Sequence, residues 1–142
     1  MKHYLFFRSL YVCPASHVRG AFVVPPAGLL LERPAGWRKL PTRGLCAFEW
    51  QQEGEAGGIA LWRTQAAAVL GCTPPEIAPQ PVCVMGETID GERWIIGTGS
   101  APHPAWSFAG SSQATAAGGF KTTFSVQWDA PHPPLRLMEK TE

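Results

Sequence analysis

The segment FKTTFSVQW, residues 120–128, indicates the fold more clearly than any other stretch of this sequence. Bulky apolar or β-branched side chains occupy every second position, at Phe120, Thr122, Phe124, Val126 and Trp128. The positions between them carry Lys, Thr, Ser and Gln. A period of two is typical of a strand with one face in the core and one face in water. The segment therefore predicts a strand of an antiparallel sheet that is wet on one side.

Other stretches extend this β-rich pattern. Residues 45–50 alternate in the same way, so Cys46, Phe48 and Trp50 should face the core. Residues 81–99 predict a hairpin, because two β-prone runs flank Asp90-Gly91, a residue pair typical of a type I′ turn. Further β-prone runs predict a central strand at 2–13, short strands at 20–24 and 29–31, and a polar connection at 51–58.

One stretch favours a helix. Ile59, Trp62, Ala66 and Val69 recur at the spacing of one helical face, and the three alanines at 66–68 have high helix propensity. Gly71 follows the last of these residues, where a helix commonly ends. We therefore expect one main α-helix at about 58–70.

Length and composition restrict the class of protein. The chain has 142 residues, enough for one domain with a real core. Charged residues make up 16% of it, against about 25% in an average soluble chain, and apolar residues make up 45%. These values exclude most disordered chains and coiled coils. We expect a single mostly β or α+β domain, residues 1–142, built as a small antiparallel sheet or sandwich with one helix.

Two segments are expected to lie outside this sheet. Residues 100–119 are rich in Gly, Ser and Pro without periodicity, which predicts a long loop. Residues 129–142 contain three prolines between 131 and 134 and predict an extended C-terminal arm. Trp106 and Phe108 are candidate partner-binding residues, because aromatics on a flexible loop are typical of binding surfaces. The alternative is that Trp106 folds back onto the sheet.

The net charge of +1 is an average over an uneven chain. Residues 1–44 hold seven basic side chains and one acidic, whereas residues 45–142 hold five basic and ten acidic. This polarity can steer assembly between copies, or the two parts can neutralise each other within one molecule. A nucleic-acid-directed module that uses the basic residues 1–44 is a further alternative function. Its candidate partner-binding residues are Trp37, Arg38 and Lys39, which place an aromatic beside two cations as single-strand binding requires. Against that alternative, the predicted strands bury most aromatics of the basic part.

The four cysteines are Cys13, Cys46, Cys72 and Cys83, without a CxxC pair. The start of the chain has no apolar run of the length that a secretory signal needs, so we expect reduced, mostly buried thiols. A small hydrolase or transferase is an alternative function. Its nucleophile would be Cys46 or Cys83, with Asp129 and His132 as partners, or it would use a pair of carboxylates.

No cofactor or metal is predicted. Cys13 and His17 are the closest thiol and imidazole, but Pro14 lies between them and structural zinc sites use tighter ligand pairs. The stretch GSSQATAAGGFKTT, residues 110–123, superficially resembles a phosphate-binding loop. Phe120 interrupts the required Gly-Lys pair, and a strand follows instead of a helix, so nucleotide binding there is not expected.

These observations favour a non-enzymatic protein-binding or assembly module that engages a protein partner or further copies of itself. The expected contact segments are residues 100–119 and the terminal arm. The sequence has no Asn and more Arg than Lys, which fits a GC-rich bacterial or phage genome. No apolar run approaches the roughly 20 residues of a membrane span. We therefore expect a cytoplasmic protein, or a virion protein if the source is a phage.

Overall fold

The protein folds as two packed β-sheets, seen in a computed structural model. The structure describes residues 2–18, 22–24, 28–31, 36–70, 77, 80–98, 102–112 and 120–139. Within these ranges, strands dominate and the helical content is one 3₁₀ turn, η1 (Ala15–Val18). The described part of the chain contains no helix with the length and apolarity that a membrane span requires.

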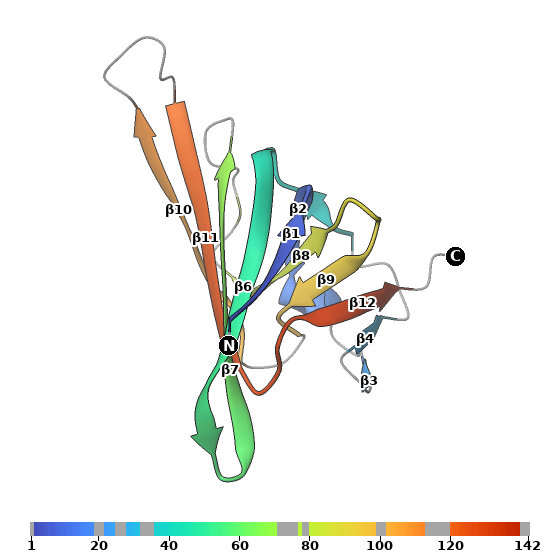
Figure 1. The fold of residues 1–142 in the computed structure, drawn as a ribbon. Helices are drawn as coiled ribbons and strands as arrows, with labels where there is room; N and C mark the ends of the chain where they lie inside the picture. Colours follow the sequence, from blue (N-terminus) through green and yellow to red (C-terminus); the bar gives the residue numbers. More distant parts are fainter. Residues whose placement is uncertain are drawn as a thin grey trace.

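The first sheet has five strands, and every neighbouring pair is antiparallel. In order across the sheet they are β1 (His3–Phe7), β6 (Thr42–Ala56), β7 (Ile59–Leu70), β11 (Phe120–Ala130) and β10 (Ala105–Ser112). Its two long hairpins extend past the second sheet at opposite ends, β6–β7 at the bottom of Figure 1 and β10–β11 at the top. The five-stranded sheet is therefore longer than the sheet that covers it.

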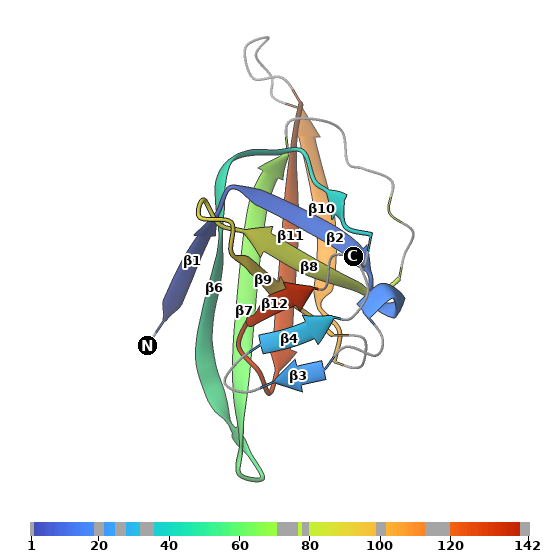
Figure 2. The same ribbon diagram turned by 90° about the vertical axis from the view of Figure 1, so that its right-hand side faces the viewer.

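The second sheet has seven shorter strands. In order they are β3 (Phe22–Val24), β4 (Gly28–Leu31), β12 (Leu135–Glu139), β9 (Arg93–Ile96), β8 (Val82–Glu87), β2 (Ser9–Pro14) and β5 (Arg38–Lys39). The pair β12–β4 is parallel and the other pairs are antiparallel. Strands β2, β8, β9 and β12 run across the strands of the five-stranded sheet behind them (Figure 2).

The main core lies between the two sheets. The five-stranded sheet contributes the fully buried aromatics Phe48, Phe124 and Trp128, and the seven-stranded sheet contributes aliphatic side chains such as Leu10 and Ile96. Burying aromatic side chains of this size supplies much of the free energy that holds such sheets together.

The seven-stranded sheet is buried on its other face as well. A second cluster there joins Leu29, Met85, Ile95 and Leu135 with Val18 of η1. Strand β8 is consequently buried along five consecutive residues, 82–86, whereas β7 alternates between buried and exposed residues over 64–68. Among the described residues, nothing comparable covers the far side of the five-stranded sheet. We call that side the outer face.

Several predictions are confirmed. Residues 120–128 form most of β11, with Phe124, Val126 and Trp128 in the core. Residues 45–50 lie within β6, and Cys46 and Phe48 are buried as expected. The hairpin around Asp90 exists as β8–β9, but its turn differs from the predicted type I′ because Gly91 has positive φ and Asp90 does not.

The predicted helix at 58–70 is wrong, because Ile59–Leu70 is strand β7. Gly57 and Gly58 have φ of 58° and 83° and form the turn of the β6–β7 hairpin. In β7 the even-numbered residues face the core and the odd-numbered residues face outward, so the stretch also satisfies a period of two. Pairing with β6 on one side and β11 on the other outweighs the helix propensity of three alanines.

Both segments expected outside the sheets also contain strands. Residues 105–112 of the predicted loop form β10, while 113–119 lie outside the described residues. In the predicted arm, β11 continues to Ala130, and Leu135–Glu139 forms β12 between β4 and β9. The prolines of that segment separate two strands, which is where a residue without an N–H group is tolerated.

Two further boundaries differ from the predictions. Residues 2–13 make two strands, β1 and β2, in different sheets, and β1 lies at a sheet edge instead of the centre. The stretch 51–58, predicted as a connection, continues β6 as far as Ala56. A register shift between Gln52 and Gly54 in the pairing with β7 accommodates Glu53 as the extra residue in that extension.

Candidate functional site

Exposed apolar side chains gather on the outer face of the five-stranded sheet. The described residues include six large hydrophobic side chains that are exposed, and five of them lie on this face: Tyr4, Phe6, Leu45, Ile59 and Leu61. Phe6 and Leu45 are each 61% exposed. The sixth, Ile89, lies at the β8–β9 turn. Tyr4, Phe6 and Leu45 line one hollow, whereas Ile59 and Leu61 lie near the β6–β7 turn. Scattered exposed apolar residues are normal, but a group that lines one hollow is typical of an interaction surface.

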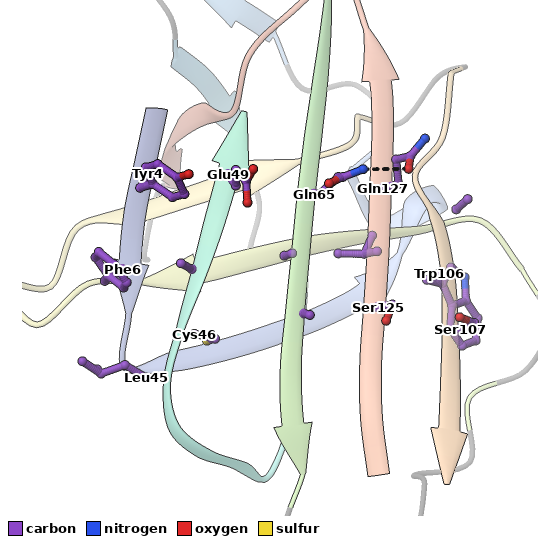
Figure 3. A pocket seen from close by; sticks show the side chains of 15 residues that line it. Tyr4, Phe6, Leu45, Cys46, Glu49, Gln65, Trp106, Ser107, Ser125 and Gln127 are labelled. Atoms are coloured by element: carbon purple, nitrogen blue, oxygen red, sulfur yellow. Dashed lines mark hydrogen bonds between the residues drawn. The ribbon is translucent and has the colours of Figure 1, made fainter. Parts of the chain in front are cut away.

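Small side chains form a trough across the middle of the outer face. Ala47, Ala67 and Ser125 are cross-strand neighbours on β6, β7 and β11, and they line the floor. Phe6 ends this row on β1 and Ser107 ends it on β10. The hollow has a volume of about 860 Å³ (Figure 3). The trough is therefore bounded by an aromatic ring at the β1 end and by a small residue at the β10 end.

Polar side chains occupy the next row of the outer face. Glu49, Gln65 and Gln127 are cross-strand neighbours, and Gln65 Nε2 donates to Gln127 Oε1 at 3.1 Å (Figure 3). Gln127 Nε2 in turn donates to Asp129 Oδ2 at 3.1 Å. These contacts hold the amides side by side, so one wall of the trough presents hydrogen-bonding groups in fixed positions.

The charged groups near this wall are paired with one another. Lys2 Nζ lies 2.6 Å from Glu49 Oε1, and Arg63 Nε lies 2.9 Å from Asp129 Oδ1. The hydrogen bond to Glu49 raises the pKa of Lys2, and the hydrogen bond to Asp129 raises the pKa of Arg63. Exposed pairs of this kind add little stability. The charged side chains beside the trough therefore neutralise one another in pairs. A polar rim of this kind commonly surrounds an apolar contact patch.

Aromatic rings attach the edge strand β10 to the core. Trp106 and Phe108 lie edge to face with centroids 5.7 Å apart, and Phe108 lies 5.1 Å from the buried Phe124. Trp106 Nε1 also donates to the carbonyl oxygen of Gln80 at 3.1 Å. Both side chains are partly buried, so they anchor β10 while Ala105 and Ser107 face the trough. Trp106 was expected either to be exposed on a loop for partner binding or to fold back onto the sheet, and in the structure its ring folds back against the sheet.

The candidate nucleophiles are buried thiols. Cys46 is 5% exposed and its Sγ lies 3.6 Å from the carbonyl oxygen of Phe7, to which it donates. Cys83 is fully buried and its Sγ donates to the carbonyl oxygen of Thr98 at 3.5 Å. Burial raises the pKa of Cys46 to about 11 and that of Cys83 to about 12. A thiol with a raised pKa is a poor nucleophile at neutral pH.

The proposed partners of those thiols have other contacts. The carboxylate of Asp129 binds Arg63 on the outer face, whereas Cys46 and Cys83 belong to two different core clusters. His132 lies beside Trp128, with ring centroids 6.4 Å apart. The structure therefore does not bring Cys46, Cys83, Asp129 and His132 together as one catalytic group.

The structure also describes the candidate metal ligands and the candidate binding residues 37–39. Cys13 is buried in β2 opposite Cys83, while His17 is exposed on η1, and the described residues include no cluster of three or more metal-ligating side chains. Trp37 packs partly buried against the second core cluster, and Arg38 and Lys39 form the short edge strand β5. The Trp37 ring is thus partly committed to the core and not freely available for stacking on a base.

No family model, curated protein or solved structure matches this chain. The residues that define the trough were not predicted from the sequence. The signal existed in the period of two over 59–70, which places Ala67 on the face opposite to Ala66 and Ala68. The helical spacing of the apolar residues in the same stretch predicted a helix instead, so this period of two was not recognised.

Proposed function

We propose that this chain is a non-enzymatic protein-binding module whose outer face docks a partner protein. The observation that carries the proposal is the collection of Tyr4, Phe6 and Leu45 around a floor of small residues on a sheet face that no described element covers. An exposed apolar cluster with a polar rim is the usual composition of a protein-binding patch.

The shape of the trough suggests what the partner presents. A row of Ala47, Ala67 and Ser125 leaves room for a bulky apolar side chain, which would contact the Phe6 ring. The paired amides of Gln65 and Gln127 can accept and donate hydrogen bonds to a peptide backbone beside it. We therefore propose a partner segment with an aromatic or large aliphatic anchor and an accessible main chain.

The structure favours this proposal over the enzyme alternative on chemical grounds. A catalytic thiol needs an accessible thiolate and a base within reach, and Cys46 and Cys83 are buried with raised pKa values. The basic side chains Lys2 and Arg8, which would serve a nucleic-acid alternative, lie 2.6 Å and 3.0 Å from carboxylate oxygens of Glu49 and Glu87.

The proposal can be tested with peptides selected from a random display library on the wild-type protein. Ala67→Arg places a long cation in the middle of the trough, where Ala67 is exposed and the fold can accept it. Ile89→Arg is the matched control, because Ile89 is 69% exposed but lies away from the outer face. We expect selected peptides to bind the Ala67→Arg variant at least about tenfold more weakly and the Ile89→Arg variant unchanged. Equal binding to wild type and to Ala67→Arg would contradict the proposal.

A further inference from the structure

The two sheets present edges that differ in how well they are protected. The edges of the seven-stranded sheet are β3, with three residues, and β5, with two. One edge of the five-stranded sheet is β1, flanked by the cations Lys2 and Arg8. Very short strands and charged side chains are the usual means by which a protein prevents pairing at a sheet edge.

The part of β6 that extends beyond β1 is protected in a similar way. It carries Glu53 and Glu55, and the register shift between Gln52 and Gly54 interrupts its regular pairing. Charges and bulges both discourage the addition of another strand.

Strand β10 has none of these protections. Its sequence, AWSFAGSS, contains no charge and no proline over eight residues. It pairs with β11 along its whole length, and no described strand pairs with its other side. Its aromatic residues Trp106 and Phe108 hold it against the core, so it is an ordered edge. A long, uncharged, ordered edge is a template for strand addition.

We infer that two copies of this chain pair through β10, edge to edge and antiparallel, to form one continuous sheet. A two-fold axis perpendicular to the sheet relates the copies and passes beside Phe108 or Ala109. This symmetry places residues of the same face opposite each other. Ser107 then lies opposite Ala109 or Ser111 of the second copy, so only small residues meet on the outer side of the junction.

Charge selects a second copy as the occupant of this edge. Two β10 strands are both neutral, and their main-chain donors and acceptors match under the two-fold axis. Pairing of β1 with β1 would instead crowd the ion pairs Lys2–Glu49 and Arg8–Glu87 of both copies along one junction. Pairing of β10 with β1 of another copy would leave a free edge on each side and would continue into a ring or filament.

The dimer would also change how the trough binds its partner, and this consequence rests on the proposed function. Because the trough opens toward β10, edge pairing joins the two outer faces into one surface with two troughs on the same side. A partner with two anchors would then gain from binding both. The pairing of β10 itself does not depend on what the trough binds.

Multi-angle light scattering and sedimentation at about 100 µM protein test the pairing. This concentration is high enough to populate a dimer of the micromolar affinity that we expect for an edge contact of this size. We expect wild type to have twice the 15.4 kDa mass of one chain. Ala109→Lys brings two cations face to face or diagonally across the two-fold axis, and should raise the dissociation constant by at least about tenfold. Ser125→Lys is the control, since it adds the same charge one strand further from the edge.

The same two variants separate this inference from the proposed function. Ser125→Lys fills the trough and should lose peptide binding but remain a dimer, whereas Ala109→Lys should become a monomer and still bind peptide. An Ala109→Cys variant should also form a cross-linked dimer with a short bis-maleimide, while Ile89→Cys should not. A monomeric wild type, a mass above that of a dimer, or an Ala109→Lys variant as dimeric as wild type would overturn the β10 dimer.

Discussion

The ring of Phe7 lies directly against Gly86, across the interface of the two sheets. A Cβ atom at position 86 would stand 2.5 Å from Cγ of Phe7, closer than real Cβ contacts allow. Phe7 pairs with Cys46 in the five-stranded sheet, and Gly86 pairs with Leu10 and Trp94 in the seven-stranded sheet. This contact therefore sets how closely the sheets approach at the β1 edge, behind the aromatic end of the trough.

Gly86→Ala should destabilise the protein, because the backbone of β8 or the ring of Phe7 must move to admit a methyl group. We expect the free energy of unfolding to fall by about 1–3 kcal/mol, measured by urea denaturation. Gly54→Ala is the control, since a Cβ there meets nothing within 4 Å. Similar losses in the two variants would show that the close approach of Phe7 and Gly86 is not the cause.

Thr64→Val should stabilise the protein. Thr64 is fully buried in β7, and its hydroxyl has no hydrogen-bond partner among the described residues. Replacing the hydroxyl by a methyl group of similar size removes an unsatisfied polar atom, so we expect the free energy of unfolding to rise by about 1 kcal/mol. Thr64→Ser keeps the hydroxyl and removes the methyl group, and should be less stable than wild type. A Val variant that melts below wild type would refute this account of Thr64.

The buried thiols predict a loss of stability at alkaline pH. Burial raises the pKa of Cys46 from 9.0 to about 11 and that of Cys83 from 9.0 to about 12. Above pH 9 the unfolded chain releases these protons before the folded chain does, so the free energy of unfolding falls until pH passes the folded-state values. Thermal melts between pH 8 and about 11 should show this decline. A Cys46→Ala variant should show a shallower one.

The same burial predicts slow alkylation of Cys46 and Cys83 in the folded protein. The raised pKa of Cys46 leaves about 100-fold less thiolate at pH 8 than an ordinary thiol has, and the still higher pKa of Cys83 leaves about 1000-fold less. Exclusion of the reagent from the core slows the reaction further. Iodoacetamide labelling followed by peptide mapping should modify both residues readily in guanidinium and barely without it. Rapid labelling of native Cys46 or Cys83 would reopen the possibility of a reactive thiol.

The sequence predicts the sheet most reliably where one face is buried and one is wet. Residues 120–128 and 45–50 have a period of two with large side chains on one side, and no other period fits them. In 59–70 the apolar residues satisfy both periods, and only the pairing with β6 and β11 selects the strand. Segment 105–112 carries small residues that mimic a loop, and Phe124 on a neighbouring strand supplies the packing that orders it.

The trough could not be predicted for a related reason. It exists because Ala47, Ala67 and Ser125 come into register across three strands, and register depends on turns and bulges distant in sequence. Each residue alone is unremarkable. The exposed aromatics Tyr4 and Phe6 were expected in a central strand, and their exposure follows from the position of β1 at the edge.

Methyl NMR of alanine-labelled protein, titrated with a library-selected peptide, tests the central proposal most directly. Ala47 and Ala67 lie on the floor of the trough, while Ala66 and Ala68, their neighbours in sequence or across the sheet, face the core. Binding at the outer face should shift the methyl signals of Ala47 and Ala67 strongly and those of Ala66 and Ala68 weakly. Saturable binding that leaves Ala47 and Ala67 unchanged and shifts Ala15, on the far side of the seven-stranded sheet, would contradict the account.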